Sequence, residues 1–335
     1  EVTKTGGLGI FDRGDSSIIG TYDEEKIKHQ YQENLVDICP VGAFTSKPFR
    51  FRQRVWFLKE KESICPGCST ACKISVHANA NKQYYYRIKP VFDEEVNGHW
   101  MCDVGRQVAE YQNPENRLDY FYRKIDKHLV VCTKEEAISD LSTKLISTKK
   151  ESIALLVSPQ YTCEEYKEFF DFFVNELEVK NIFQWRSKKE SIKDFDGLLL
   201  RGDRNPNTHG LQDALQAHGI KKEIRNEIDD CLDSNPELLI VLAPENAQAY
   251  HHLEKDLETL ARGNCVFMLS SLQQVREGNF FDHLIPMVTF AEKKGHYLNH
   301  RRKQRFLTSP YKPFVENAMQ VGDLIAKLKA RVLNH

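Results

Sequence analysis

Three cysteines within eight residues constrain this chain more than any other feature. They read Cys65-Pro-Gly-Cys68-Ser-Thr-Ala-Cys72, and Cys102 follows in Trp-Met-Cys-Asp-Val-Gly-Arg. Cysteines this close rarely reach disulfide geometry, and the odd total of nine suits a disulfide framework poorly. A tight loop can instead direct several thiolates at one point, so the spacing indicates a metal centre.

Two kinds of metal centre fit these cysteines. Structural zinc usually combines two CxxC-type pairs, whereas a cubane iron–sulfur cluster is often held by three cysteines of one loop and a distant fourth. The pattern CxxCxxxC with a distant Cys102 follows the second arrangement, and Gly67 allows the backbone to bend closely around a cluster. The spacing therefore favours a 4Fe-4S cluster, with zinc as the alternative. The candidate ligands are Cys65, Cys68, Cys72 and Cys102.

A fifth cysteine, Cys39, precedes a proline in Val-Asp-Ile-Cys-Pro-Val-Gly-Ala. Cys-Pro is how the remote fourth ligand of a ferredoxin-type cluster commonly reads. Its close-spaced partners would lie upstream of residue 1, which is Glu, so the pattern predicts that the chain is the later part of a longer polypeptide. A lone structural cysteine at a turn explains Cys39 equally well.

The other four cysteines lie in or beside apolar stretches and are expected to be core residues. They are Cys132, Cys163, Cys231 and Cys265. Free thiols and thiolate ligands point to a reducing compartment. The balance of 47 Lys and Arg against 48 Asp and Glu argues against a generic basic nucleic-acid binder and an acidic disordered chain. The longest uninterrupted apolar run, Leu238–Ala243, is far too short to span a bilayer.

Short apolar runs alternate with helical patterns from about residue 150. This order predicts an α/β fold with a parallel sheet flanked by helices. The expected strands are Ile153–Val157, Asn181–Trp185, Leu198–Leu200, Leu238–Leu242 and Val266–Leu269, and the expected helices are Glu135–Ile146, Cys163–Leu177 and Val321–Val332. Thr133 and Glu136 form a capping-box pattern before the first of these helices. The aromatic segment Tyr84–Lys89 is expected in a small sheet that supports the cluster loop.

These motifs resemble the large iron–sulfur subunit of respiratory NADH:quinone oxidoreductase (complex I), known in bacteria as its G subunit. The resemblance begins in residues 34–52, Asn-Leu-Val-Asp-Ile-Cys-Pro-Val-Gly-Ala-Phe-Thr-Ser-Lys-Pro-Phe-Arg-Phe-Arg, and continues through Ser63-Ile-Cys-Pro-Gly-Cys and Val96-Asn-Gly-His-Trp-Met-Cys-Asp-Val-Gly-Arg106. It then extends through Asp203-Arg-Asn-Pro-Asn-Thr208 and Thr289-Phe-Ala-Glu-Lys-Lys-Gly295 to Asn299.

The resemblance implies a domain organisation. Residues 1–58 would be the end of a ferredoxin-like iron–sulfur region, and 59–118 a small, mainly β 4Fe-4S domain of the type found in molybdenum and tungsten bis-pterin enzymes. Residues 119–335 would be a Rossmann-like parallel α/β domain of the molybdopterin oxidoreductase type. In this family, Cys65, Cys68, Cys72 and Cys102 match an additional tetranuclear cluster off the main electron path. Cys39 matches the fourth ligand of a second 4Fe-4S cluster.

Two departures from the catalytic molybdopterin enzymes lead us to expect no molybdenum. Those enzymes carry a Cys, selenocysteine or Ser metal ligand after the segment that reads Val179-Lys-Asn-Ile-Phe-Gln-Trp-Arg-Ser187, where Ser187 is a weak candidate. They also often place Lys after the Cys-Asp pair, where this chain has Val104. No GxGxxG or Walker A motif is present, and no catalytic residue is expected.

The resemblance implies one-electron transfer from NADH and flavin toward quinone, as one subunit of an enzyme complex. Partner subunits would bind flavin and NADH or form the quinone module, with no nucleic acid and no direct membrane span. The subunit would be a peripheral protein on the cytoplasmic side of the bacterial inner membrane. The alternatives are a catalytic molybdopterin-dependent oxidoreductase, such as an NAD-linked formate dehydrogenase, and a zinc-stapled interaction domain.

Two basic clusters are either solvated faces, contacts with acidic partner subunits, or compensation for cluster charge. The first is Lys47, Arg50, Arg52, Arg54, Lys59 and Lys61, and the second is His300, Arg301, Arg302, Lys303 and Arg305.

Overall fold

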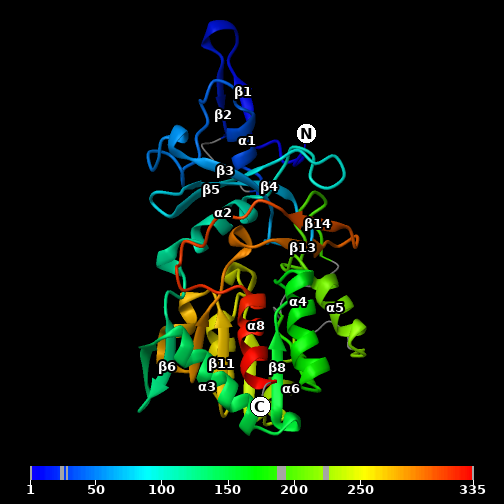
Figure 1. Ribbon diagram of the computed structural model, residues 1–335. Helices are drawn as coiled ribbons and strands as arrows, with labels where there is room; N and C mark the ends of the chain where they lie inside the picture. Colours follow the sequence, from blue (N-terminus) through cyan, green and yellow to red (C-terminus); the bar gives the residue numbers. More distant parts are fainter. Residues whose placement is uncertain (1, 23–25, 28, 187–193, 222–225, 334–335) are drawn as a thin grey trace.

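The computed structural model describes residues 2–22, 26–27, 29–186, 194–221 and 226–333. A long α/β layer forms the lower part of the molecule and smaller β elements lie above it, with the N-terminal hairpin projecting at the top (Figure 1). That hairpin pairs β1 (Gly9–Phe11) with β2 (Ile18–Gly20), and the short helix α1 (Glu33–Ile38) follows.

The upper layer is built on a three-stranded antiparallel sheet in the order β3–β4–β5. Its strands are β3 (Lys59–Ile64), β4 (Lys73–Asn79) and β5 (Tyr84–Pro90). The helix α2 (Asp103–Tyr111) packs on β5. The expected strand at Tyr84–Lys89 is therefore confirmed.

A seven-stranded sheet forms the centre of the lower layer, in the order β7–β6–β12–β11–β10–β8–β9. The five strands from β8 to β12 run parallel, and β6 and β7 add an antiparallel edge. The strands are β6 (Phe121–Ile125), β7 (His128–Cys132), β8 (Ile153–Val157), β9 (Asn181–Gln184), β10 (Leu238–Leu242), β11 (Val266–Ser270) and β12 (His283–Pro286). The strand order reverses between β8 and β10, which is the point where doubly wound folds bind ligands.

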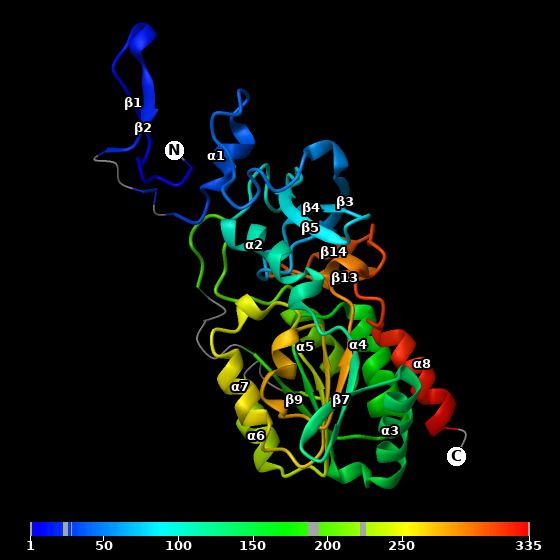
Figure 2. The ribbon, with the colours of Figure 1, turned by 90° about the vertical axis from the view of Figure 1, so that its left-hand side faces the viewer.

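Helices cover both faces of this sheet, so its central strands are almost continuously apolar. Alternate residues such as Leu155 and Ile240 face one core, with α3 (Lys134–Ser147), α4 (Cys163–Phe170), α5 (Thr208–Ala217) and α8 (Val321–Val332). Leu156 and Val241 face the other core, with α6 (Ile228–Asp233) and α7 (Leu253–Leu260). Figure 2 shows the two helical layers on opposite sides of the strands. The predicted α/β fold is confirmed.

One expected strand is wrong. Leu198–Leu200 lies in a bend, where Asp196 and the Tyr31 hydroxyl accept the backbone N–H groups of Leu199 and Leu200 that a neighbouring strand would otherwise have taken. Two further strands were not expected from the sequence. They are β13 (Gly295–Leu298) and β14 (Gln304–Leu307), which pair as an antiparallel hairpin near the β3–β4–β5 sheet.

Candidate iron–sulfur site

The tight turn between β3 and β4 carries three of the candidate ligands. The backbone N–H of Cys65 donates to the carbonyl of Cys72 at 2.9 Å, directly after the last strand pair, so the two ends of the loop are fixed together. Cys65, Cys68 and Cys72 are each 4–5% exposed, and Cys102 is 6% exposed. All four belong to one buried cluster of side chains, so the structure places the four cysteines selected by their spacing in the same part of the core.

Cys102 reaches this loop as the N-cap residue of α2. The contact depends on two glycines. A Cβ placed on Gly105 would lie 2.8 Å from Cys65 Sγ and 3.7 Å from Cys102 Sγ, and one on Gly67 would lie 3.5 Å from the Gly105 Cα. Because neither glycine has a side chain, the cysteine loop and the start of α2 can approach each other closely beside the sulfur atoms of Cys65 and Cys102.

Burial determines the protonation of Cys65, Cys72 and Cys102. Burial, and then the neighbouring cysteines, raise the pKa of Cys65 and of Cys72 well above the ordinary thiol value. Burial raises the pKa of Cys102 to about 12, although the Gly105 N–H and Arg204 oppose the rise. Arg305 likewise favours the Cys72 thiolate. The bare thiols of Cys65, Cys72 and Cys102 are therefore neutral near pH 7, and a metal must displace their protons to bind.

Segments distant in the sequence also hold the loop by hydrogen bonds. The Ser69 N–H donates to the carbonyl of Asp203 at 2.9 Å, and the Ser69 carbonyl accepts the His300 N–H at 2.8 Å. The Thr70 hydroxyl donates to the carbonyl of Leu199. Arg305 Nε donates to Ala71 O at 3.0 Å. The loop is thus held by groups from the α/β layer and from the β13–β14 hairpin.

The second basic cluster therefore has at least one buried member beside the sulfurs. Arg305 is 6% exposed and also pairs with Asp93 at 2.6 Å. In the first cluster, Arg50, Arg52 and Arg54 lie over aromatic rings near the surface. The charge-compensation interpretation fits Arg305, and the solvated-face interpretation fits these three arginines.

Among the residues that the structure describes, no three or more His, Cys, Asp or Glu side chains are grouped so that they could hold a metal ion. The fit to an iron–sulfur cluster therefore rests on the donor set itself, four buried thiols from one loop and one helix end. The glycine contact and the nearby arginines add to it. These residues suit a cluster that binds thiolates and carries negative charge.

Cys39 lies outside the buried cluster of side chains that contains the other four. It is the C-cap residue of α1, and the Phe44 N–H and neighbouring backbone N–H groups lower its pKa. Arg106 on α2 pairs with Asp37 at 2.6 Å, and so ties α1 to the helix that begins after Cys102. A loop of N–H groups around a sulfur is a setting that stabilises a thiolate.

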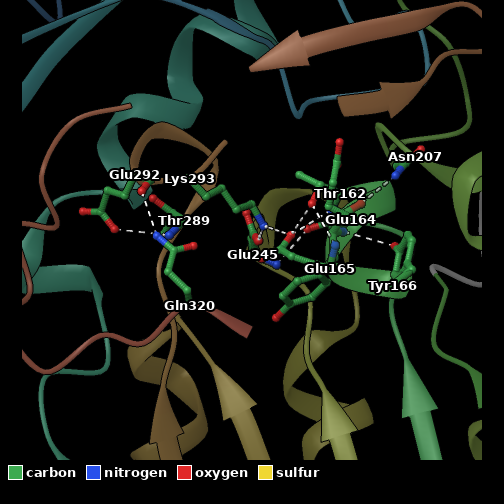
Figure 3. Close-up of polar contacts among 12 residues, drawn as sticks. Thr162, Glu164, Glu165, Tyr166, Asn207, Glu245, Thr289, Glu292, Lys293 and Gln320 are labelled. Atoms are coloured by element: carbon green, nitrogen blue, oxygen red, sulfur yellow. Dashed lines mark hydrogen bonds and ion pairs between the residues drawn. The ribbon is translucent and has the colours of Figure 1, made fainter. Parts of the chain in front are cut away.

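A second polar region lies at the carboxyl end of the parallel sheet, where the strand order reverses (Figure 3). The Lys293 ammonium donates to Glu165 at 2.7 Å and to Glu245, and all three side chains are buried. Gln160, in the loop after β8, links this loop to the one after β10. Its Oε1 accepts the N–H groups of Glu245 and Asn246 at 2.8 and 2.7 Å. Side chains of the chain itself therefore fill the space beside these strand ends, and this arrangement does not fit a bulky pterin cofactor.

Two positions bear on the molybdenum alternative. Ser187 lies outside the described residues. Val104 packs against the apolar cluster around the cysteines, so no cation stands at the position where catalytic relatives often carry Lys. The Lys293 cluster was not predicted as a group, although Thr162 and Glu165 form a capping box that their spacing already signals.

Comparisons with known proteins match both cysteine-bearing regions. Residues 1–45 match the family model of the NADH-quinone oxidoreductase subunit 3 ferredoxin-like domain, and residues 58–114 match that of the molybdopterin oxidoreductase Fe4S4 domain. The second match includes all four clustered cysteines and supports an iron–sulfur cluster.

Curated relatives give the same result. The G subunit of NADH-quinone oxidoreductase from Rickettsia felis is 32% identical over 47% of this chain and 23% of its own length. NADH-quinone oxidoreductase subunit 3 of Thermus thermophilus is 33% identical over 47% and 20%. The mitochondrial NADH dehydrogenase [ubiquinone] iron-sulfur protein 1 of Solanum tuberosum is 29% identical over 55% and 24%. The matched part of the chain thus spans about a quarter of the length of these relatives or less.

Among solved structures, acetylene hydratase from Pelobacter acetylenicus superposes with a TM-score of 0.52 at 8% identity, covering 81% of this chain and 69% of that protein. At this identity the likeness concerns the fold alone. The family models and the curated relatives together confirm the resemblance that the cysteine motifs indicate: the chain is similar to part of the large iron–sulfur subunit, the bacterial G subunit, of NADH-quinone oxidoreductase.

Proposed function

We propose that the chain is an iron–sulfur electron-transfer and structural subunit of NADH:quinone oxidoreductase. Its own cluster would be a 4Fe-4S cluster on Cys65, Cys68, Cys72 and Cys102. The observation that supports the proposal is that four buried thiols, from a hairpin loop and a helix end, lie in one buried cluster of side chains. The family match at residues 58–114 supports it independently.

When bound, the cluster supplies one-electron transfer. The chain's own residues bind it, exclude water from it and balance its charge. The Gly105 N–H and Arg204 favour the Cys102 thiolate, and Arg305 favours that of Cys72. Positive charge and N–H groups near the sulfurs stabilise the more negative, reduced state and so raise the potential. No side chain acts as an acid, base or nucleophile in this function.

Cys39 is proposed as a ligand of a second 4Fe-4S cluster. The N–H groups that lower its pKa and its partial exposure at the C-terminal end of α1 support this role. Its partners would be none of the four buried cysteines, because Cys39 lies outside their cluster.

The proposed partners are the other subunits of the complex, namely those that bind flavin and NADH and those of the quinone module. The relatives are named as subunits of this enzyme, which supports such an assembly. The proposed place is the cytoplasmic face of the bacterial inner membrane. Within the described residues, none of the helices combines the length and the apolar character that crossing a bilayer needs.

Metal analysis of the chain, reconstituted without oxygen, tests the cluster. We expect about four iron and four acid-labile sulfide per chain, with no stoichiometric molybdenum. The Cys72→Ser variant should lose the tetranuclear spectroscopic signal, because a hydroxyl is a poor replacement for a buried thiolate ligand. Cys265→Ser is the matched control, since this cysteine packs at the edge of the α/β core and should leave the signal unchanged.

Each contrary result selects an alternative. One zinc per chain and no iron would identify a zinc-stapled interaction domain and reject the cluster. Stoichiometric molybdenum would favour the catalytic oxidoreductase. A tetranuclear signal that survives Cys72→Ser in a folded chain would remove this cysteine from the ligand set.

A further inference from the structure

A pocket of about 300 Å³ opens beside the cluster loop, between the bend at Leu198–Leu200 and the turn that joins β13 to β14. Its polar lining comes from four segments of the chain that are distant in the sequence. The residues that matter here are Thr70, Arg201, Asn299, His300, Arg301 and Lys303. Neither the fold nor the proposed cluster requires an opening at this place.

Three residues that line the pocket also carry buried polar atoms without partners. Within the described part of the chain, Arg201 Nε, Asn299 Nδ2 and His300 Nε2 are buried and find no hydrogen-bond partner. An unpaired buried polar group reduces stability, so three of them in residues that line one pocket call for a ligand or ordered water.

The Asn299 side chain shows which kind of atom the pocket can accept. Asn299 is 0% exposed, and its Oδ1 accepts the N–H groups of Arg301 at 2.9 Å and Lys303 at 3.0 Å. These two bonds fix the orientation of the amide, because a flipped Nδ2 would face two other donors. The Nδ2 group is therefore a fixed donor, and it needs an acceptor.

The charge of the pocket favours an anion. Glu95 pairs with Lys303, which leaves Arg201 and Arg301 as cations without an acidic counterpart among the lining residues. Burial and then the charge of Arg201 lower the pKa of His300, as a positive potential would. Arg201 also lies over the Phe195 ring at 4.3 Å, so its guanidinium is held in place before any ligand arrives.

His300 adds a different requirement. Its Nδ1 lies 3.3 Å from the carbonyl of Ser69, which can only accept, so Nδ1 carries the proton. The neutral ring then presents Nε2 as an acceptor. The pocket thus offers donors from Arg201 and Asn299 together with one acceptor, and hydrogen phosphate has both acceptor oxygens and one O–H donor. Sulfate has acceptor oxygens only.

We propose that this pocket binds hydrogen phosphate, either as the free ion or as the phosphate group of a larger ligand. Arg201 and Asn299 would donate to its oxygens, and His300 would accept its hydroxyl. The volume lies at the lower end of the range for ligand pockets, which suits a small anion with some water. The proposal goes beyond the iron–sulfur function and does not depend on it.

Equilibrium dialysis with radiolabelled inorganic phosphate tests the proposal on the full chain, with sulfate and AMP as competitors. The key variant is Asn299→Asp, which keeps the oxygen that accepts Arg301 and Lys303 but replaces the unpaired donor with a second oxygen. We expect its phosphate affinity to fall at least about tenfold. Arg201→Gln should weaken binding in the same direction through the loss of a cation.

Arg302→Gln is the matched control. Arg302 lies in the same basic segment but pairs with Asp213 at 2.7 Å and does not line the pocket, so its loss should leave phosphate affinity within about twofold. Circular dichroism of each variant confirms that the chain is folded.

The binding results distinguish a hydrogen phosphate site from its alternatives. Saturable phosphate binding that sulfate displaces poorly, and that Asn299→Asp weakens, supports the site. Tighter binding of AMP than of inorganic phosphate would identify a phosphate ester as the ligand. No saturable binding of phosphate in the folded chain would overturn the proposal, and so would equal affinity for sulfate. Because the measurement does not involve iron, a chain that lacks a cluster but binds phosphate would reject only the cluster proposal.

Discussion

Replacing Lys293 with Met should be among the most destabilising single changes in this protein. The Lys293 side chain is 1% exposed and its ammonium pairs with Glu165 at 2.7 Å and with Glu245, which are 8% and 2% exposed. Met preserves much of the volume but removes the charge, which leaves two buried carboxyl groups facing each other. Breaking a buried ion pair from one side costs about 3–5 kcal/mol, a large fraction of the stability of a typical domain.

The stability lost in Lys293→Met should depend on pH, and the titration of Glu245 determines whether the loss grows or shrinks as the pH rises. Burial raises the pKa of Glu245 to about 7, although Lys293 opposes the rise. Because this folded-state pKa lies above the ordinary value of 4.5, ionising Glu245 reduces stability as the pH rises from about 4.5 to 7. Without Lys293 the pKa rises further, so the variant should lose most at about pH 8 and least near pH 5.

The ammonium itself adds no pH dependence in this window. Burial lowers the pKa of Lys293, but the two carboxylates raise it above 10.5 in total, so its contribution is fully present below that pH. The difference between the proteins in the pH 5–8 range therefore reports on Glu245.

Urea denaturation at pH 5, 7 and 8 measures the effect. Lys294→Met is the control, because Lys294 is the exposed neighbour and its loss should change stability by less than about 0.5 kcal/mol. Adding Glu245→Gln to Lys293→Met should recover part of the stability at pH 8, since it removes one of the two buried carboxylates that have lost their cation. A cost of Lys293→Met below about 1 kcal/mol at pH 8, or a cost that does not change with pH, would refute the reasoning.

Two further changes test local features. Gly105→Ala places a Cβ 2.8 Å from both Cys65 Sγ and Met101 Cε, so we expect a cost of about 1–3 kcal/mol and a lower iron content, measured by thermal unfolding and iron analysis of one preparation. Unchanged values for both would show that the loop and α2 can separate freely. Thr133→Ala removes the cap that accepts the Glu136 N–H at 3.2 Å, and urea denaturation should report a loss of about 1 kcal/mol.

The sequence could predict those parts of the structure that are formed by residues close together in the chain. The spacing of Cys65, Cys68 and Cys72 is a property of one turn, and the structure places all three in a single tight loop. The capping box at Thr133 and Glu136 forms as expected, because its bonds join residues three apart. Buried strands such as β8 are recognisable because an apolar run of five residues fits a strand covered on both faces.

Features that depend on distant partners could not be predicted in this way. Leu198–Leu200 has the composition of a strand, yet Tyr31 and Asp196 take its backbone N–H groups and hold it in a bend. Arg305 belongs to a basic run that suggests a solvated face, yet its guanidinium is buried against the loop carbonyl of Ala71. In each case a deciding contact joins residues more than 160 positions apart, which no local pattern encodes.

The same long-range contacts bear on what the cluster does for the protein. The loop that would bind three of its irons is held by bonds from Asp203, His300 and Arg305, all of which come from the α/β layer or from the hairpin attached to it. The fourth proposed ligand, Cys102, stands at the start of α2, which packs on the small sheet. A cluster bound at this point would therefore link the small sheet, α2 and the α/β layer through one loop. Such a position favours a structural role even where the cluster lies away from the main path of the electrons, since its loss would loosen contacts on both sides at once.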